Sequence, residues 1–320
     1  MITTAPSSGT PYHRLQRCDP RHRWWRPLVV GLVAVGLYVA AFFGVVVVVI
    51  GVALAVPSVE LAVDRSLQGD LDSGDPLSLA LLLGLLALLL PAFLVAARLT
   101  GSRPAGLISS VTGRLRLRWL RTATLLAFAV WAPVMAVWVG VEAAAGILTV
   151  REVAPTTSIA LLLVTLALVP FQAAAEEYVF RGYLAQLVGS WLRHPLFAVL
   201  LPVPLFVLGH GYGTLGAVDV GLFAVFCGWI TWRTGGLEAA IAAHVANNVV
   251  LMSLTAVGLG DPNATDTSVA GLVVSTVMMI VFTVLVSRRA DASGILRSRP
   301  TSAEVEAQEA VPAALPATVR

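Results

Sequence analysis

The chain has 320 residues, of which 58% are hydrophobic and only 12% charged, and its formal net charge at pH 7 is +3. Soluble globular domains carry roughly 25% charged residues, so this composition excludes an ordinary soluble domain and favours helices that face lipid. The basic residues are all arginines and form no patch interleaved with aromatic side chains, so nucleic acid is not an expected partner.

The elements in chain order begin with residues 1–22, which are rich in Ser, Thr, Pro and Arg and predict a disordered cytoplasmic arm. The apolar run 27–56 is much longer than the roughly 7–15 residues of a signal-peptide core, so it predicts a retained membrane anchor. Further apolar segments follow at 77–97, 122–147, 157–180, 195–210, 217–232, 236–256 and 268–287. Several approach the ~20 residues that cross a bilayer, whereas those at 195–210 and 217–232 are short.

The charges of the loops predict how these segments are oriented. Arginines cluster before the first segment, at 98–121, at 181–193, at 233 and after residue 287, whereas the loops at 57–76 and 257–267 are mainly acidic. Because arginine marks the cytoplasmic side, eight spans with both termini cytoplasmic fit the pattern. We therefore expect an all-α, polytopic membrane helical bundle of about eight transmembrane helices in the cell membrane.

The predicted organisation has four parts. The arm of residues 1–22 precedes three N-terminal spans within 23–150, and the spans of 151–289 form the functional core. Residues 290–320 are rich in Ala, Pro and Glu and predict a disordered C-terminal tail.

Polar residues inside the apolar segments mark the candidate site, because each costs roughly 2.5–3.5 kcal/mol on insertion and requires a partner or a function. Glu177 and Arg181 are four residues apart and are predicted to form an ion pair on one helix face. Glu176 points about 100° away and is left to meet another helix. The alternative is that both glutamates only mark the membrane interface.

Two later segments contribute further polar groups. His210 follows a stretch rich in Pro and Gly that predicts a distorted helix, and it is either structural or catalytic. His244 and Asn248 share a helix face one turn apart. They either form interhelical hydrogen bonds or donate to a developing oxyanion.

Together, Glu176, His210, His244 and Asn248 lie on three separate apolar helices, and helix bundles build sites from such facing side chains. A carboxylate and an imidazole that share a water would provide general-base catalysis, and the other histidine with the asparagine would stabilise a tetrahedral intermediate. We therefore expect these side chains to converge for peptide hydrolysis by an activated water.

The motifs EExxxR (176–181), FxxxH (206–210) and HxxxN (244–248) resemble those of the CAAX prenyl protease and bacteriocin-processing (CPBP, Abi) family of intramembrane endopeptidases. The resemblance covers about residues 157–256 and implies a CAAX-protease-like core. It implies that Glu176 and His210 activate the water and that His244 and Asn248 form the oxyanion hole. It further implies that Glu177, Arg181 and Phe206 support the site.

The family is often labelled an intramembrane metalloprotease, and zinc, if present, would be held by Glu176, His210 and His244. The sequence has no HExxH motif, so a required metal cofactor is not expected. The expected partners are the lipid bilayer and a peptide or membrane-protein substrate, with CAAX-type, peptide and bacteriocin processing all open.

Two other classes of function compete with the protease. One is a non-catalytic immunity or scaffold protein of the same fold, which the loss of a motif residue would favour. The other is a transporter, which predicts a symmetric repeat of broken helices, whereas the polar residues here lie in one half of the chain.

Overall fold

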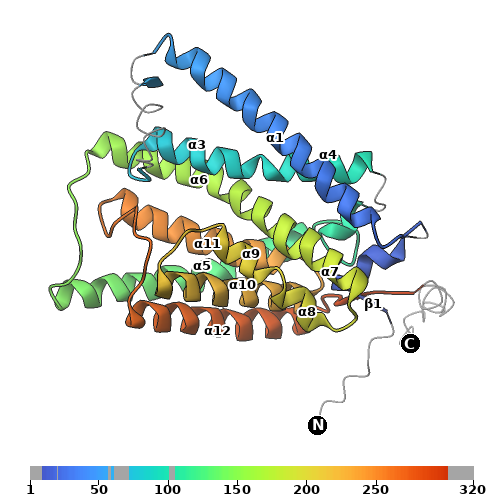
Figure 1. Ribbon diagram of the computed structural model, residues 1–320. Helices are drawn as coiled ribbons and strands as arrows, with labels where there is room; N and C mark the ends of the chain where they lie inside the picture. The colour runs from blue at the N-terminus through green and yellow to red at the C-terminus, as the bar shows by residue number, and fades with distance from the viewer. Residues whose placement is uncertain (1–8, 20, 57–58, 61–71, 101–104, 302–320) are drawn as a thin grey trace, which may run out of the picture.

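The computed structural model describes residues 9–19, 21–56, 59–60, 72–100 and 105–301, which form a bundle of helices lying side by side (Figure 1). Within these ranges, seven helical stretches are long and apolar enough to cross a membrane. They are α1 (Arg26–Ala53), α3 with α4 (Pro76–Ala87 and Leu89–Leu99), α5 (Leu117–Ala144), α6 (Pro155–Glu177) with its continuation to Trp191, α10 (Thr214–Thr234), α11 (Glu238–Ala256) and α12 (Val269–Ala292). The predicted all-α, multi-pass membrane fold is confirmed.

The remaining predicted span, 195–210, is a short broken pass made of α8 (Pro195–Leu200) and α9 (Val203–Leu208). Pro202 and Pro204 interrupt the helix because proline lacks the N–H that a continuous helix requires. The 14 residues of Pro195–Leu208 would cover about 21 Å as one helix, which is less than the ~30 Å of a bilayer core.

This short pass nevertheless carries the chain from one end of the bundle to the other. Ahead of α10, Gly213 N–H donates to Thr265 O at 2.8 Å, so α10 starts beside the segment that leads into α12. The two helices then run in parallel, because Arg233 near the end of α10 pairs with Asp291 near the end of α12 at 2.8 Å. Counting the short pass, the described helices cross the bundle eight times.

The two ends of the described chain lie together. Strand β1 (Thr10–Pro11) pairs antiparallel with β2 (Ser298–Arg299), and Figure 1 shows β1 at one end of the bundle. An even number of passes requires this arrangement. The cytoplasmic assignment of that end remains a prediction.

The expectation of a disordered arm over 1–22 is wrong for residues 9–19. After β1 comes the 3-10 helix η1 (Tyr12–Cys18), in which Tyr12 and Leu15 are 1% and 2% exposed. The Tyr12 hydroxyl donates a hydrogen bond to Ile108 O. The polar composition misled the prediction, because two apolar side chains three residues apart are enough to anchor one turn in the core. Residues 1–8 and 20 lie outside the described residues.

The expectation of a disordered tail from residue 290 is likewise wrong up to residue 301. Helix α12 continues to Ala292, and β2 then returns to β1. Residues 302–320 lie outside the described residues.

The main core forms where α5 packs against α11 and α12. The buried residues of α11 there are five alanines, and small side chains allow helix backbones in membranes to approach closely. They are Ala239, Ala240, Ala242, Ala243 and Ala246, packed with Trp119, Ala123, Ala127 and Trp131 of α5. These contacts join residues on both sides of the domain boundary that was expected at residue 150. Helix α5 therefore belongs to the same bundle as residues 151–289.

Candidate functional site

The site is built on one long helix that changes its winding where the acidic residues lie. Helix α6 ends at Glu177, the π-helical segment η3 (Tyr178–Leu184) continues it, and α7 (Ala185–Trp191) completes it. π-Helical turns are rare and are frequent at functional sites. Glu176 and Glu177 are 6% and 0% exposed, so two adjacent carboxyl groups are buried at this change of winding.

Glu177 connects this helix to α11. Its Oε1 accepts a hydrogen bond from Arg181 Nη1 at 2.9 Å, as the spacing predicts. The same oxygen lies 2.8 Å from His244 Nδ1. Because a carboxylate only accepts, this contact places a proton on Nδ1 and turns Nε2 of the ring toward Glu176. Glu177 therefore does more than pair with Arg181, because it also orients His244.

Glu176 keeps one oxygen free. Its Oε1 accepts from Gln172 Nε2 at 2.6 Å, whereas its Oε2 is buried and has no hydrogen-bond partner among the described residues. This Oε2 lies 3.7 Å from His244 Nε2. That separation is too long for a direct hydrogen bond and suits two groups that share a small polar molecule.

Asn248 joins the site through Gln172, which the sequence analysis missed. Asn248 Nδ2 donates to Gln172 Oε1 at 3.1 Å, so one amide links α6 and α11 next to Glu176. An amide group has two N–H donors, so Asn248 retains a second one. The sequence does contain a signal that could have identified Gln172, because this polar residue lies four positions before Glu176 in a largely apolar helix.

The chain of amides continues away from the site. Asn247 Nδ2 donates to Asn248 Oδ1 at 3.1 Å, and Trp131 Nε1 of α5 donates to Asn247 Oδ1 at 3.0 Å. Three helices therefore hold the Asn248 side chain in one orientation.

His210 lies beside this cluster, and its ring does not hydrogen-bond to Glu176. It follows α9, where its Nδ1 is 2.7 Å from Phe206 O, which leaves Nε2 available. The Phe206 ring centroid is 4.6 Å from that of His210 and 6.4 Å from that of His244, so one aromatic ring contacts both histidines. Of the four residues expected to converge, the structure brings together Glu176, His244 and Asn248, and it places His210 across the Phe206 ring.

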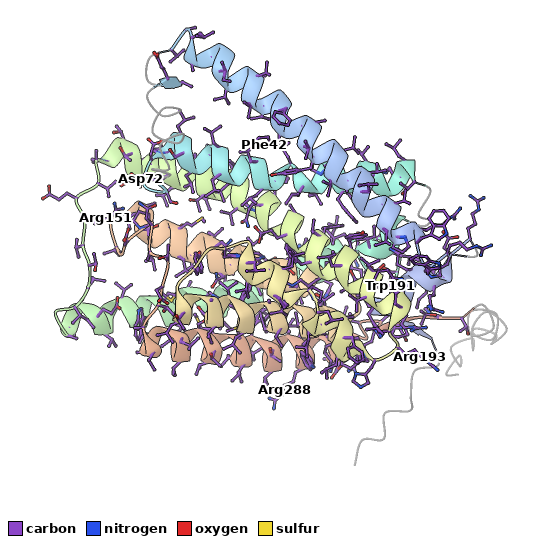
Figure 2. The ribbon with its side chains drawn as sticks, viewed as in Figure 1. Phe42, Asp72, Arg151, Trp191, Arg193 and Arg288 are labelled. Atoms are coloured by element: carbon purple, nitrogen blue, oxygen red, sulfur yellow. The ribbon has the colours of Figure 1, made fainter. Side chains whose placement is uncertain are left out.

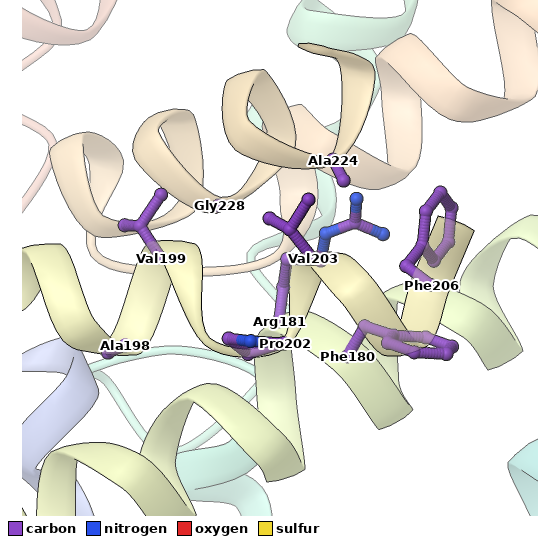
Figure 3. A pocket seen from close by; sticks show the side chains of 9 residues that line it. All are labelled: Phe180, Arg181, Ala198, Val199, Pro202, Val203, Phe206, Ala224 and Gly228. Atoms are coloured by element: carbon purple, nitrogen blue, oxygen red, sulfur yellow. The ribbon is translucent and has the colours of Figure 1, made fainter. Parts of the chain in front are cut away.

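A pocket opens on the other side of Phe206, between η3, the α8–α9 pass and α10. Figure 3 shows the Arg181 guanidinium among its lining side chains, which are otherwise apolar and come from Phe180, Ala198, Val199, Pro202, Val203, Phe206, Ala224 and Gly228. The guanidinium lies 4.2 Å above the Phe206 ring centroid. A neighbouring pocket shares Arg181 and Val199 and reaches Tyr12 and His13 of η1. Two small pockets therefore lie on either side of Arg181 and Val199, one next to Phe206 and one next to η1.

The residues expected to hold zinc are not arranged as a ligand set. Within the described ranges, no group of three or more His, Cys, Asp or Glu side chains is placed to hold a metal ion. Glu176 Oε2 and His244 Nε2 lie 3.7 Å apart, but His210 lies across the Phe206 ring from this pair. In this conformation the three side chains do not fit a three-ligand zinc centre.

Comparison with known proteins locates the similarity in this part of the chain. Residues 156–250 match the family described as type II CAAX prenyl endopeptidase Rce1-like. An uncharacterized protein of Bacillus subtilis (strain 168), YyaK, is 39% identical over 98 residues, which are 28% of this chain and 33% of that protein. The chain thus matches about a third of this relative's length. No solved structure matches.

Proposed function

We propose that this chain, whose residues 156–250 match the Rce1-like family of type II CAAX prenyl endopeptidases, is an intramembrane endopeptidase. Glu176 is its general base. The observation that carries the proposal is the free, buried Glu176 Oε2, which faces His244 Nε2 across 3.7 Å. A water lying beside this pair, within hydrogen-bond distance of both atoms, would be oriented for attack and shielded from bulk solvent.

The reaction follows from these positions. Glu176 Oε2 takes a proton from the water as the water oxygen attacks the carbonyl carbon of the substrate. The oxyanion that forms accepts hydrogen bonds from the second Asn248 N–H and from His244 when its Nε2 is protonated. Collapse of the tetrahedral intermediate breaks the C–N bond, and the proton held by Glu176 passes to the leaving amine.

His210 is proposed as a second group on the water or the substrate. Its Nδ1 is occupied by the Phe206 carbonyl, so Nε2 is the nitrogen that would act. The small apolar pocket beside Phe206 and Arg181 would have to widen to accept a substrate side chain from a peptide or membrane protein. The end of the bundle that carries both termini is proposed to face the cytoplasm.

The test is hydrolysis of C-terminal peptides, with and without a prenyl group, by the purified full chain in detergent. We expect Glu176→Gln to lower kcat/KM by about 10²- to 10⁴-fold, the usual contribution of a general base, and His210→Ala to lower it as well. Glu142→Gln is the matched control, because Glu142 is a partly exposed acid near the end of α5 and is not part of the site. A chelator added to the wild type tests for a required metal.

The results of this assay distinguish an endopeptidase from a non-catalytic protein of the same fold. Wild-type turnover by Glu176→Gln would remove Glu176 from catalysis. If the folded wild type cleaves none of the peptides, a non-catalytic immunity or scaffold role gains support instead.

A further inference from the structure

The end of the bundle that carries both termini holds a cluster of arginines without matching acids. Arg17 Nε donates to Ser190 O at 2.7 Å, and His13 Nε2 lies 2.9 Å from Arg193 O. These two contacts fix η1 against the end of α7. They therefore hold Arg14 and Arg17 of the arm close to Arg193.

The charges in this cluster repel one another. Burial lowers the pKa of Arg14, and the neighbouring charges of Arg17 and Arg193 lower it further. Asp19 is the nearby acid, and its Oδ1 accepts from the backbone N–H of Arg21 at 2.8 Å. Arg14 Nη1 is buried without a hydrogen-bond partner among the described residues. Three cations are thus held together, and among the described residues none of them forms an ion pair with an acid.

Exposed tryptophans surround the same cluster. Trp24, Trp25 and Trp191 are 66%, 45% and 43% exposed, and Trp191 Nε1 donates to Trp24 O at 2.9 Å. Figure 2 shows Trp191 and Arg193 at this end of the bundle, where α1 begins. Because tryptophan is enriched at the depth of lipid headgroups, these side chains suit a membrane interface, where a lipid headgroup would be the nearest source of an anion.

We propose that Arg14, Arg17 and Arg193 form a binding site for the phosphate of an anionic phospholipid headgroup, flanked by Trp24 and Trp191. The lipid would neutralise the cluster and hold η1 against α7. Because Tyr12 and His13 of η1 line the pocket next to Arg181 and Val199, the bound lipid would also stabilise the wall of that pocket.

The experiment measures lipid binding to the purified full chain by native mass spectrometry, with phosphatidylglycerol compared against phosphatidylcholine. We expect the wild type to prefer phosphatidylglycerol. The Arg14→Gln/Arg193→Gln variant should lose about thirtyfold in affinity, because each arginine near an anionic surface contributes about fivefold. The preference should weaken at high salt.

The matched control is Arg288→Gln/Arg289→Gln, which removes the same charge from two exposed positions near the end of α12. Arg14→Lys/Arg193→Lys keeps the charge and should retain the preference, which separates lost binding from a misfolded arm. Equal binding of the two lipids by the wild type, or an equal loss in the control, would overturn the proposal. Competition by inorganic phosphate as strong as that by phosphatidylglycerol would assign the site to a free anion and would also overturn it.

Discussion

Replacing Glu177 by Gln tests the buried ion pair on which the site rests. Glu177 and Arg181 are 0% and 3% exposed, and Oε1 of Glu177 contacts both Arg181 and His244. The substitution leaves the Arg181 charge buried without its partner. Breaking a buried pair from one side costs about 3–5 kcal/mol, so we expect Glu177→Gln to lower the free energy of unfolding by that amount.

Removing both charges should cost less than the two single changes together. Glu177→Gln/Arg181→Met leaves no unpaired charge, although it still loses the stacking of Arg181 on Phe206. We expect a coupling energy of roughly 1–3 kcal/mol between the two positions, measured by reversible unfolding in mixed detergent micelles. Additive effects to within about 0.5 kcal/mol would refute the reasoning.

A second ion pair in the same chain, which is partly exposed to solvent, is the control for this double-mutant comparison. Arg233 and Asp291 are separated by 2.8 Å, and the Asp291 side chain is 49% exposed. Because water screens such a pair, Arg233→Gln/Asp291→Asn should show a coupling of only about 0–1 kcal/mol.

Two further predictions concern the packing around the site. A Cβ at Gly31 of α1 would lie 2.2 Å from the Tyr183 hydroxyl oxygen, so Gly31→Leu should destabilise the protein by about 1–3 kcal/mol, whereas Gly36→Leu on the same helix meets no atom within 4 Å. Equal melting temperatures for the two variants would contradict this packing. Burial lowers the pKa of His13 below its ordinary value, so the unfolded arm binds the proton more readily. Docking of the arm should therefore be strongest above about pH 6.5 and weaken as the pH falls toward the lowered pKa. Hydrogen exchange of residues 12–18 measures this, and His13→Gln should flatten the dependence; protection that rises on acidification would contradict it.

The membrane fold was largely predictable because lipid demands long apolar helices, which composition reveals directly. The broken pass at 195–210 was visible as a short segment with prolines. The folded arm was not predictable, because its anchoring depends on the fit of Tyr12 beside Ile108, which are 96 positions apart. Sequence pattern reports local periodicity and carries no information on such a distant contact.

Several residues of the candidate site were predictable, but Gln172 and the geometry of the site were not. The four-residue spacings identified Glu177 with Arg181 and His244 with Asn248 as pairs that share a helix face. The contact of Glu177 with His244 depends on how α6 and α11 pack, which the spacing within either helix does not determine. The position of His210 depends on the bend at α9, so its distance from Glu176 was equally outside the reach of the sequence.

The pairing of β1 with β2 has a consequence for reporter experiments. Since the two strands are hydrogen-bonded, a tag fused ahead of residue 9 and a tag fused beyond residue 301 emerge from the same face of the molecule. A reporter enzyme that is active only in the periplasm must therefore give the same result at both fusion points. The same holds for a fluorophore that matures only in the cytosol.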